Sequence, residues 1–250
     1  MRSIILCEGF DDNYIIGYYL YKTKKWVYNK SGKISKMYEL PKVNKNQIIE
    51  VYEKGSDRLI IWSVGGKDNF KKAFEFLNKI NTNYPDERIN QVFVFADRDM
   101  NDIDTCIKSI MVEMNDEGIN IQKLKNDCIN IWDFEIEEQK YEQKIIPIII
   151  PFEEEGAVET LLMNAIAENG YEDEFIIEEA KSYILKYLER YKDGKYLKHE
   201  RQRLKAKFSA VISITNPDRS TTVFNNLLTS SDWEKSSTIK KHLHMFDELL

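Results

Sequence analysis

Residues 91–102 read QVFVFADRDMND, and this stretch decides the fold class. Its first half is apolar without alternation, which is typical of a parallel β-strand buried on both faces. The strand ends at Asp97 and Asp99, and an amphipathic helical pattern follows over residues 103–114. A buried strand that leads directly into a helix predicts a βαβ unit, in which the next strand runs parallel to the first.

Two earlier segments repeat this arrangement. The apolar residues 3–7 end in Glu8, and the apolar residues 59–64 end in a pair of glycines. Helical patterns follow both strands, over residues 13–22 and 70–77. The alternation of strands and helices predicts an α/β fold with a parallel central sheet flanked by helices.

The rest of the chain continues the sheet and then becomes mainly helical. Two further β-rich runs cover residues 129–137 and 144–150, and helical patterns follow them. We expect residues 1–170 to form the main domain, with a basic insertion at about 23–57. Residues 171–250 are then expected to form a mainly helical extension packed on that domain.

The net charge of −6 conceals two basic segments. Residues 22–54 hold nine Lys and three Glu, a balance of +6, and residues 181–207 hold ten Lys or Arg and three acids, a balance of +7. The remaining residues therefore carry −19, since −6 − 13 = −19. Two basic segments on an acidic body suit a polyanion held against an acidic metal site, although lysine-rich segments are also common as solvated surface.

Membrane insertion and secretion are not indicated. No run of eighteen apolar residues occurs, so no membrane span is predicted. The first residues, MRSIILCEG, become acidic too early for a secretory signal and lack a small-residue cleavage site, so we expect a cytoplasmic protein. Cys7, Cys106 and Cys128 lack metal-site spacing, and we expect all three to be thiols in or near the core.

The acidic strand ends are the candidate site. Because the carboxyl ends of parallel strands lie along one edge of a sheet, Glu8, Asp97 and Asp99 are expected to meet there. Three carboxylates placed together repel one another unless a cation lies among them. A set of oxygen ligands without His or Cys suits Mg²⁺ or Mn²⁺. An Asp-x-Asp pair alone is weak support, because acids are common at strand ends and helix caps.

Three segments carry a family resemblance. Residues 4–12 (IILCEGFDD), 60–66 (IIWSVGG) and 92–102 (VFVFADRDMND) resemble, in this order, the signature segments of the Toprim domain, which is shared by topoisomerases, primases and several nucleases. The resemblance covers roughly residues 1–118. It implies a Toprim-like parallel sheet and phosphodiester chemistry.

The resemblance also implies roles for single residues. The glutamate that matches Glu8 is the general acid or base of that family, and the aspartates that match Asp97 and Asp99 hold Mg²⁺. A further acid of some members falls on Asn101, which is a weaker ligand, and Asp102 or Asp104 could replace it. Topoisomerase and primase activities are not expected, because no active-site-tyrosine domain or zinc ribbon accompanies these segments.

A second set of matches points to a subfamily. The EGFDD segment is similar to one in nucleases of the overcoming-lysogenisation-defect (OLD) type and their small single-domain relatives, which implies that Asp12 joins a second metal site. Residues 158–162 (VETLL) and 204–207 (LKAK) are similar to two later segments of these relatives. They imply that Glu159 binds the second metal and that Lys205 lies near the scissile phosphate. The alternatives are that Glu159 is a solvated flank residue and that Lys205 is one surface charge among ten.

The leading hypothesis is therefore Mg²⁺- or Mn²⁺-dependent cleavage of DNA or RNA, with one or two ions. A phosphotransferase or phosphatase is one alternative, because Asp11, Asp12 and Asp97 imitate the acids of a receiver domain. A non-catalytic module that binds nucleic acid or protein in a repair or phage-defence assembly is another. Since the sequence has no GxxxxGK[ST] motif, any ATPase partner would be a separate chain. DNA or RNA, strandedness and oligomeric state stay open.

Overall fold

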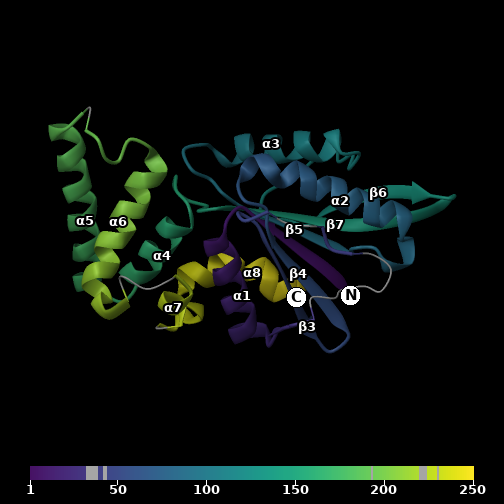
Figure 1. Ribbon diagram of the computed structural model, residues 1–250, viewed down its shortest axis with the longest axis horizontal. Coiled ribbons are helices and arrows are strands. Elements are labelled where there is room, and N and C mark those ends of the chain that lie inside the picture. Colours follow the sequence, from purple (N-terminus) through teal and green to yellow (C-terminus); the bar gives the residue numbers. More distant parts are fainter. Residues whose placement is uncertain (32–38, 42–43, 193, 220–223, 230) are drawn as a thin grey trace.

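The computed structural model describes the chain except for residues 32–38, 42–43, 193, 220–223 and 230. A seven-stranded sheet forms its centre, in the order β2-β3-β4-β1-β5-β7-β6 (Figure 1). The strands are β1 (Arg2–Cys7), β2 (Val27–Tyr28), β3 (Ile48–Lys54), β4 (Asp57–Ser63), β5 (Gln91–Asp97), β6 (Asn130–Ile136) and β7 (Gln139–Ile150).

The four central strands are parallel. Strand β1 pairs in parallel with β4 and β5, and β5 pairs in parallel with β7. Strands β3 and β6 are antiparallel additions beside β4 and β7. The predicted α/β class with a parallel central sheet flanked by helices is confirmed, and the carboxyl ends of β1, β4, β5 and β7 share one edge.

The helices form two layers and a separate group. Helices α2 and α3 cover one face of the sheet, and α1 and α8 cover the other (Figure 1). Helices α4, α5 and α6 gather beyond the carboxyl edge. Their bounds are α1 (Phe10–Lys24), α2 (Phe70–Asn83), α3 (Ile103–Asp116), α4 (Val158–Ala167), α5 (Tyr171–Arg190), α6 (Glu200–Thr215), α7 (Phe224–Leu228) and α8 (Ser237–Leu249), with 3-10 turns at Lys67–Asn69, Pro85–Glu87, Pro217–Arg219 and Trp233–Lys235.

The core lies on both faces of the sheet. The inner strands lack polar alternation because both of their faces are covered, and residues 92–95 of β5 are all fully buried. The C-terminal helix α8 belongs to this core. The ring of its Phe246 lies 5.1 Å from that of Phe93 and 6.4 Å from that of Phe95, measured between centroids. The described helices include none that is both long and apolar enough to cross a membrane.

Three sequence-based expectations need correction or restriction. Of the predicted basic insertion, residues 32–38 and 42–43 lie outside the described residues, while strand β3 extends the sheet next to β4. Cys7 and Cys106 are buried as expected, but Cys128 is exposed, because it lies in the turn before β6. The division of the chain near residue 170 stays a prediction.

Candidate functional site

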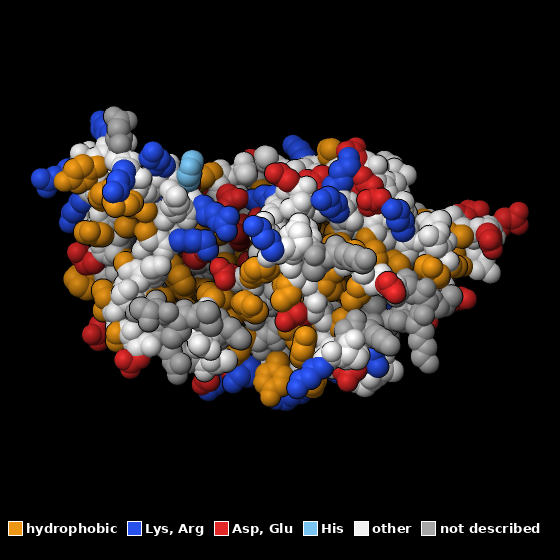
Figure 2. Space-filling model, in the orientation of Figure 1, with side chains coloured by type: hydrophobic (Ala, Val, Ile, Leu, Met, Phe, Trp, Pro, Cys, Tyr) orange, Lys and Arg blue, Asp and Glu red, His pale blue; other side chains and the backbone are white. Residues whose placement is uncertain are grey.

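A cleft of about 940 Å³ opens at the carboxyl edge of the sheet. The connections that follow β1, β4, β5 and β7 form one side of it, and residues of α5 and α6 form the other. Figure 2 shows Lys and Arg side chains gathered where the α5–α6 group faces the sheet, with acidic side chains recessed beside them. The six residues that the sequence singled out all line this cleft: Glu8, Asp12, Asp97, Asp99, Glu159 and Lys205.

Glu8 is held by the backbone of its neighbours. Its Oε1 accepts a hydrogen bond of 2.9 Å from the backbone N–H of Asp97. Its carbonyl oxygen accepts two more, each of 2.9 Å, from the N–H groups of Gly65 and Gly66. Gly65 has φ +81°, and a Cβ there would lie 2.7 Å from the carbonyl oxygen of Asn46, so the turn requires glycine. The Gly-Gly pair thus fixes the end of β4 against Glu8.

Asp97, which is half-buried at the end of β5, and Asp12, which is buried in the first turn of α1, each accept a hydrogen bond from the backbone at the start of a helix. The N–H of Val158, at the start of α4, donates to Asp97 Oδ1 at 3.0 Å. The N–H of Gly9, at the start of α1, donates to Asp12 Oδ2 at 2.8 Å. Backbone N–H groups at a helix N-terminus stabilise negative charge, so each carboxylate has one favourable contact in an otherwise buried place.

Asp99 occupies a strained turn. Its φ of +54° is in the left-handed region that few residues other than glycine adopt. Two backbone hydrogen bonds, of 2.7 and 2.8 Å, pair Asp99 with Gly156. A Cβ at Gly156 would lie 2.1 Å from Thr160 Oγ1, so only glycine fits here. This bridge ties the end of β5 to the segment that leads into α4.

Lys67 is a residue that the sequence reasoning missed. Its ammonium group forms an ion pair with Asp99 and lies 3.7 Å from Glu8 Oε1. Burial alone would lower the pKa of Lys67, but Glu8 and Asp99 raise it above its usual value. The signal for Lys67 was its place directly after the glycine pair at the end of β4, where the sheet edge gathers its polar groups.

Lys205 makes the corresponding contacts on the other side of the cleft. Its Nζ lies 2.6 Å from Glu159 Oε1 and 3.3 Å from Asp11 Oδ2. The residue Glu159 is only 6% exposed, which rules out the alternative that it is a solvated flank residue. The sequence pattern marks Asp11 only as a receiver-like acid. Lys205 therefore joins α6 to the starts of α1 and α4.

Three of the carboxyl groups, those of Glu8, Asp12 and Asp97, have raised pKa values. Burial, followed by the negative charge of Asp97, raises the pKa of Glu8 to about 8. Burial and then Glu8 raise the pKa of Asp12. Burial, Asp12 and Glu159 raise the pKa of Asp97 well above its usual range. Buried acids that repel one another are stabilised either by protons or by a nearby cation.

The chemistry of these donors fits a hard divalent cation, since all are carboxylate oxygens. Among the described residues, however, no group of three or more His, Cys, Asp or Glu side chains stands ready around one point as a metal site requires. Instead, the ammonium groups of Lys67 and Lys205 lie beside four of the acids. A metal ion at either place would have to replace a lysine contact.

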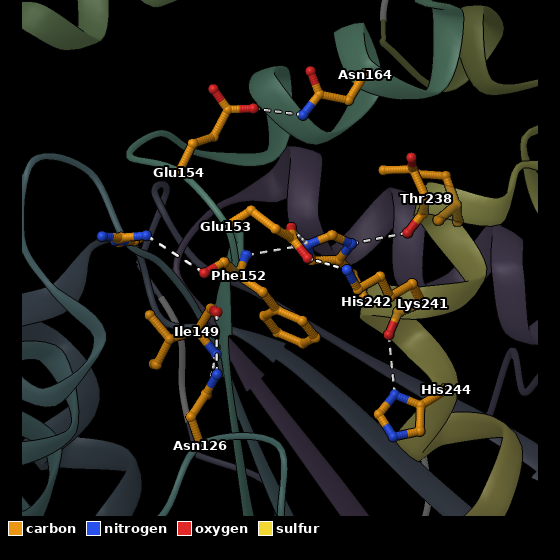
Figure 3. Close-up of polar contacts among 12 residues, drawn as sticks. Asn126, Ile149, Phe152, Glu153, Glu154, Asn164, Thr238, Lys241, His242 and His244 are labelled. Carbon is orange, nitrogen blue, oxygen red and sulfur yellow. Dashed lines mark hydrogen bonds and ion pairs between the residues drawn. The ribbon is translucent and has the colours of Figure 1, made fainter. Parts of the chain in front are cut away.

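Helix α8 braces the segment between β7 and α4. Figure 3 shows His242 of α8 facing this segment, where its Nε2 accepts a hydrogen bond of 3.1 Å from the N–H of Phe152. Because Nε2 accepts there, Nδ1 carries the proton and donates to the carbonyl of Thr238 at 2.8 Å. Lys241 of α8 also forms an ion pair with Glu153. The segment between β7 and α4, which contains Gly156, is thus held in place by contacts with the C-terminal helix.

The two basic segments differ in their placement. Residues 181–207 contribute Lys181, Arg201, Lys205 and Lys207 to the cleft. Residues 22–54 contribute Asn46 but none of their described lysines. The cleft therefore has an acidic floor at the sheet edge and a basic wall on α5 and α6.

Comparison with known proteins gives a family and a structural neighbour. Residues 2–247 match the model of a family described as "Protein of unknown function (DUF3226)". No curated protein matches the chain. The structure is similar to the crystal structure of the hypothetical protein PH0156 from Pyrococcus horikoshii OT3, with a TM-score of 0.56, 19% identity, and coverage of 99% of this chain and 91% of that one. At this identity the similarity concerns the fold alone.

Proposed function

The chain belongs to the DUF3226 family, and we propose that it is a divalent-metal-dependent nuclease that hydrolyses phosphodiester bonds of DNA or RNA. One observation carries the proposal: a single cleft collects acids that follow the ends of β1, β5 and β7, where buried and half-buried carboxyl groups repel one another opposite a basic wall on α5 and α6. Burying charged carboxyl groups together costs free energy, and such groups with raised pKa values are typical of functional sites. As part of the same proposal, the protein works in the cytoplasm.

The resemblance to the Toprim domain and to OLD-type nucleases supports this reading. The three motifs occur at the ends of β1, β4 and β5, whose carboxyl ends adjoin in the sheet. In our proposal Glu8, Asp97 and Asp99 hold one Mg²⁺ or Mn²⁺ ion, and Asp12 with Glu159 hold a second. Such ions clamp a phosphate, activate water and stabilise a departing oxygen when bound.

The chain's own residues have complementary roles in this proposal. Glu8 transfers a proton at its Oε atoms, as the resemblance implies, and the N–H of Asp97 holds its Oε1 at 2.9 Å. Lys205 places a positive charge next to Glu159, where it can offset the charge that develops on the phosphate. Lys181, Arg201 and Lys207 hold the phosphate backbone without reading its sequence.

The test is hydrolysis of single- and double-stranded DNA and RNA with Mg²⁺ or Mn²⁺. The wild-type protein should cleave at least one of these substrates, and Asp97→Asn should lower the rate by about a hundredfold or more. Asp116→Asn is the matched control, because Asp116 is an exposed acid paired with Lys71 away from the cleft. Absence of cleavage by the wild type, or equal rates for wild type and Asp97→Asn, rejects the proposal.

A non-catalytic binding module is the second candidate. It is favoured by the ion pairs that Lys67 and Lys205 form with the acids, because these pairs offset part of the site's negative charge without a metal. Such a module would bind nucleic acid or a companion protein, including a separate ATPase chain. Tight binding of nucleic acid by the wild type without any metal-dependent turnover would select this candidate.

A further inference from the structure

The connection between α5 and α6 exposes two tyrosines that each have a cation over the ring. Tyr191 is 50% exposed and Tyr196 is 62% exposed. The guanidinium of Arg190 lies 5.6 Å from the ring centroid of Tyr191, and the ammonium of Lys195 lies 4.9 Å from that of Tyr196. Tyr191 also packs against Tyr187, with centroids 5.3 Å apart. Aromatic faces and positive charges therefore alternate along this connection.

The connection leads directly to the cleft. It enters α6, whose residues Arg201 and Lys205 line the cleft. Within the described part of the chain, Lys198 and Arg201 take part in no ion pair, in contrast to Arg203, which pairs with Glu200 at 2.9 Å. Figure 2 shows hydrophobic and basic side chains interleaved over the α5–α6 end of the molecule, on the same side as the cleft. A polyanion bound there would reach the acidic floor along unpaired positive charges.

Exposed tyrosines flanked by cations are suited to binding nucleotides. An aromatic side chain gains free energy by stacking on a base, and any base can serve because each has a π-face. Arg and Lys beside the ring hold the phosphates that accompany the base. In a duplex the base faces are already covered by neighbouring pairs, so an exposed aromatic side chain cannot stack on them without unpairing. Unpaired bases match this surface best.

We propose that the cleft takes single-stranded nucleic acid, with unpaired bases stacked on Tyr191 and Tyr196 and the backbone led along Lys198 and Arg201 towards Lys205. This inference rests on the proposed function for the kind of ligand, and it adds the strandedness and the residues that select it. Stacking of bases on Tyr191 and Tyr196 needs no metal.

The experiment is a fluorescence-anisotropy titration in EDTA, so that binding is measured without cleavage. The probes are labelled twenty-nucleotide oligodeoxythymidylate and oligouridylate and a DNA duplex of the same length. The wild type should bind one or both single strands more tightly than the duplex. Tyr191→Ala and Tyr196→Ala should each weaken single-strand binding by about fivefold or more. Tyr196→Phe keeps the aromatic ring and should bind single strands as tightly as the wild type does.

The matched control is Tyr171→Ala. Tyr171 is 91% exposed on α5 but stands before the acids Glu172, Asp173 and Glu174. This variant should bind as the wild type does. Equal binding by wild type and both alanine variants overturns the inference, as does wild-type preference for the duplex or a failure to bind any single strand. The proposed function fails separately, if cleavage with Mn²⁺ is absent or survives Asp97→Asn.

Discussion

At the scale of single residues, two lysines offset part of the negative charge that the acids bring to the cleft. Lys67 pairs with Glu8 and Asp99, and Lys205 pairs with Glu159 and Asp11. Each lysine comes from a segment distant in sequence from its partners. Burial makes the charged form of Glu159, and in part that of Glu8, unfavourable, so the contacts with lysine stabilise these carboxylates when no metal is present. A divalent cation would compete with the ammonium groups for the same oxygens.

Lys67→Met should therefore tighten Mn²⁺ binding. The substitution removes the competing positive charge and leaves the acids around Glu8 with stronger mutual repulsion, which a cation relieves. We expect the dissociation constant for Mn²⁺, measured by isothermal titration calorimetry, to fall by about fivefold or more, or about 1 kcal/mol. Lys71→Met is the control, because Lys71 of α2 forms an exposed ion pair with Asp116 at the end of α3. Weaker Mn²⁺ binding by Lys67→Met would count against competition.

The raised pKa of Glu8 makes the stability of the metal-free protein depend on pH. Glu8 keeps its proton up to pH about 8 in the folded chain, whereas its ordinary pKa is 4.5. Between these values the folded state binds more protons than the unfolded state, so the free energy of unfolding falls as pH rises from 5 to 8. The decrease is at most about 1.4 kcal/mol per pH unit for one group.

Urea unfolding at pH 5 and pH 8 in EDTA checks this dependence. Glu8→Gln should reduce the loss of stability between the two values, because it removes one titrating group and weakens the repulsion felt by Asp97. Mn²⁺ should also reduce the loss, because a bound cation favours the charged acids. An identical loss in the wild type and Glu8→Gln would show that Glu8 does not titrate in this range.

At the scale of secondary-structure elements, the site depends on how strand ends are joined to one another. The turn after β4 bonds to Glu8 through Gly65 and Gly66, and the turn after β5 bonds to Gly156 through Asp99. The start of α4 bonds to Asp97. These backbone contacts place the carboxyl groups with little freedom, as binding of a small ion requires.

Gly156→Ala should disturb the site through the backbone. The new Cβ would lie 2.1 Å from Thr160 Oγ1, and the backbone φ of +149° is one that residues other than glycine rarely adopt. We expect a loss of about 1–3 kcal/mol in the free energy of unfolding, together with weaker Mn²⁺ binding. Gly170→Ala is the control, because Gly170 has a similar φ of +142° with nothing within 4 Å. Equal losses in both variants would mean that the clash with Thr160 is unimportant.

At the scale of the whole molecule, the C-terminal helix α8 packs against the central strand β5 and the segment that leads into the cleft. Helix α8 packs on β5 through Phe246 and supports the segment before α4 through His242. The rings of Phe93, Phe95 and Phe246 form one buried cluster on that face of the sheet. The C-terminal helix is thus part of the scaffold of the site as well as of the core.

Phe246→Ala should test this dependence on the C-terminal helix. The side chain is fully buried, and its loss leaves a cavity next to β5, so we expect the free energy of unfolding to fall by about 3–5 kcal/mol. Urea unfolding measures the effect, with Val112→Ala on the exposed surface of α3 as the control. A loss below about 1 kcal/mol would mean that α8 contributes little to the core.

The amino-acid sequence by itself determined the strand–helix alternation and the shared edge of Glu8, Asp97 and Asp99. Both follow from local patterns: unbroken apolar runs make buried strands, and parallel strands end on the same side. Only the tertiary structure decided that Lys67 forms an ion pair with Glu8 and that Lys205 forms one with Glu159. It also decided that His242 of α8 accepts a hydrogen bond from the backbone of Phe152. Such contacts depend on how distant segments pack in three dimensions, and no periodicity or spacing along the chain encodes that packing.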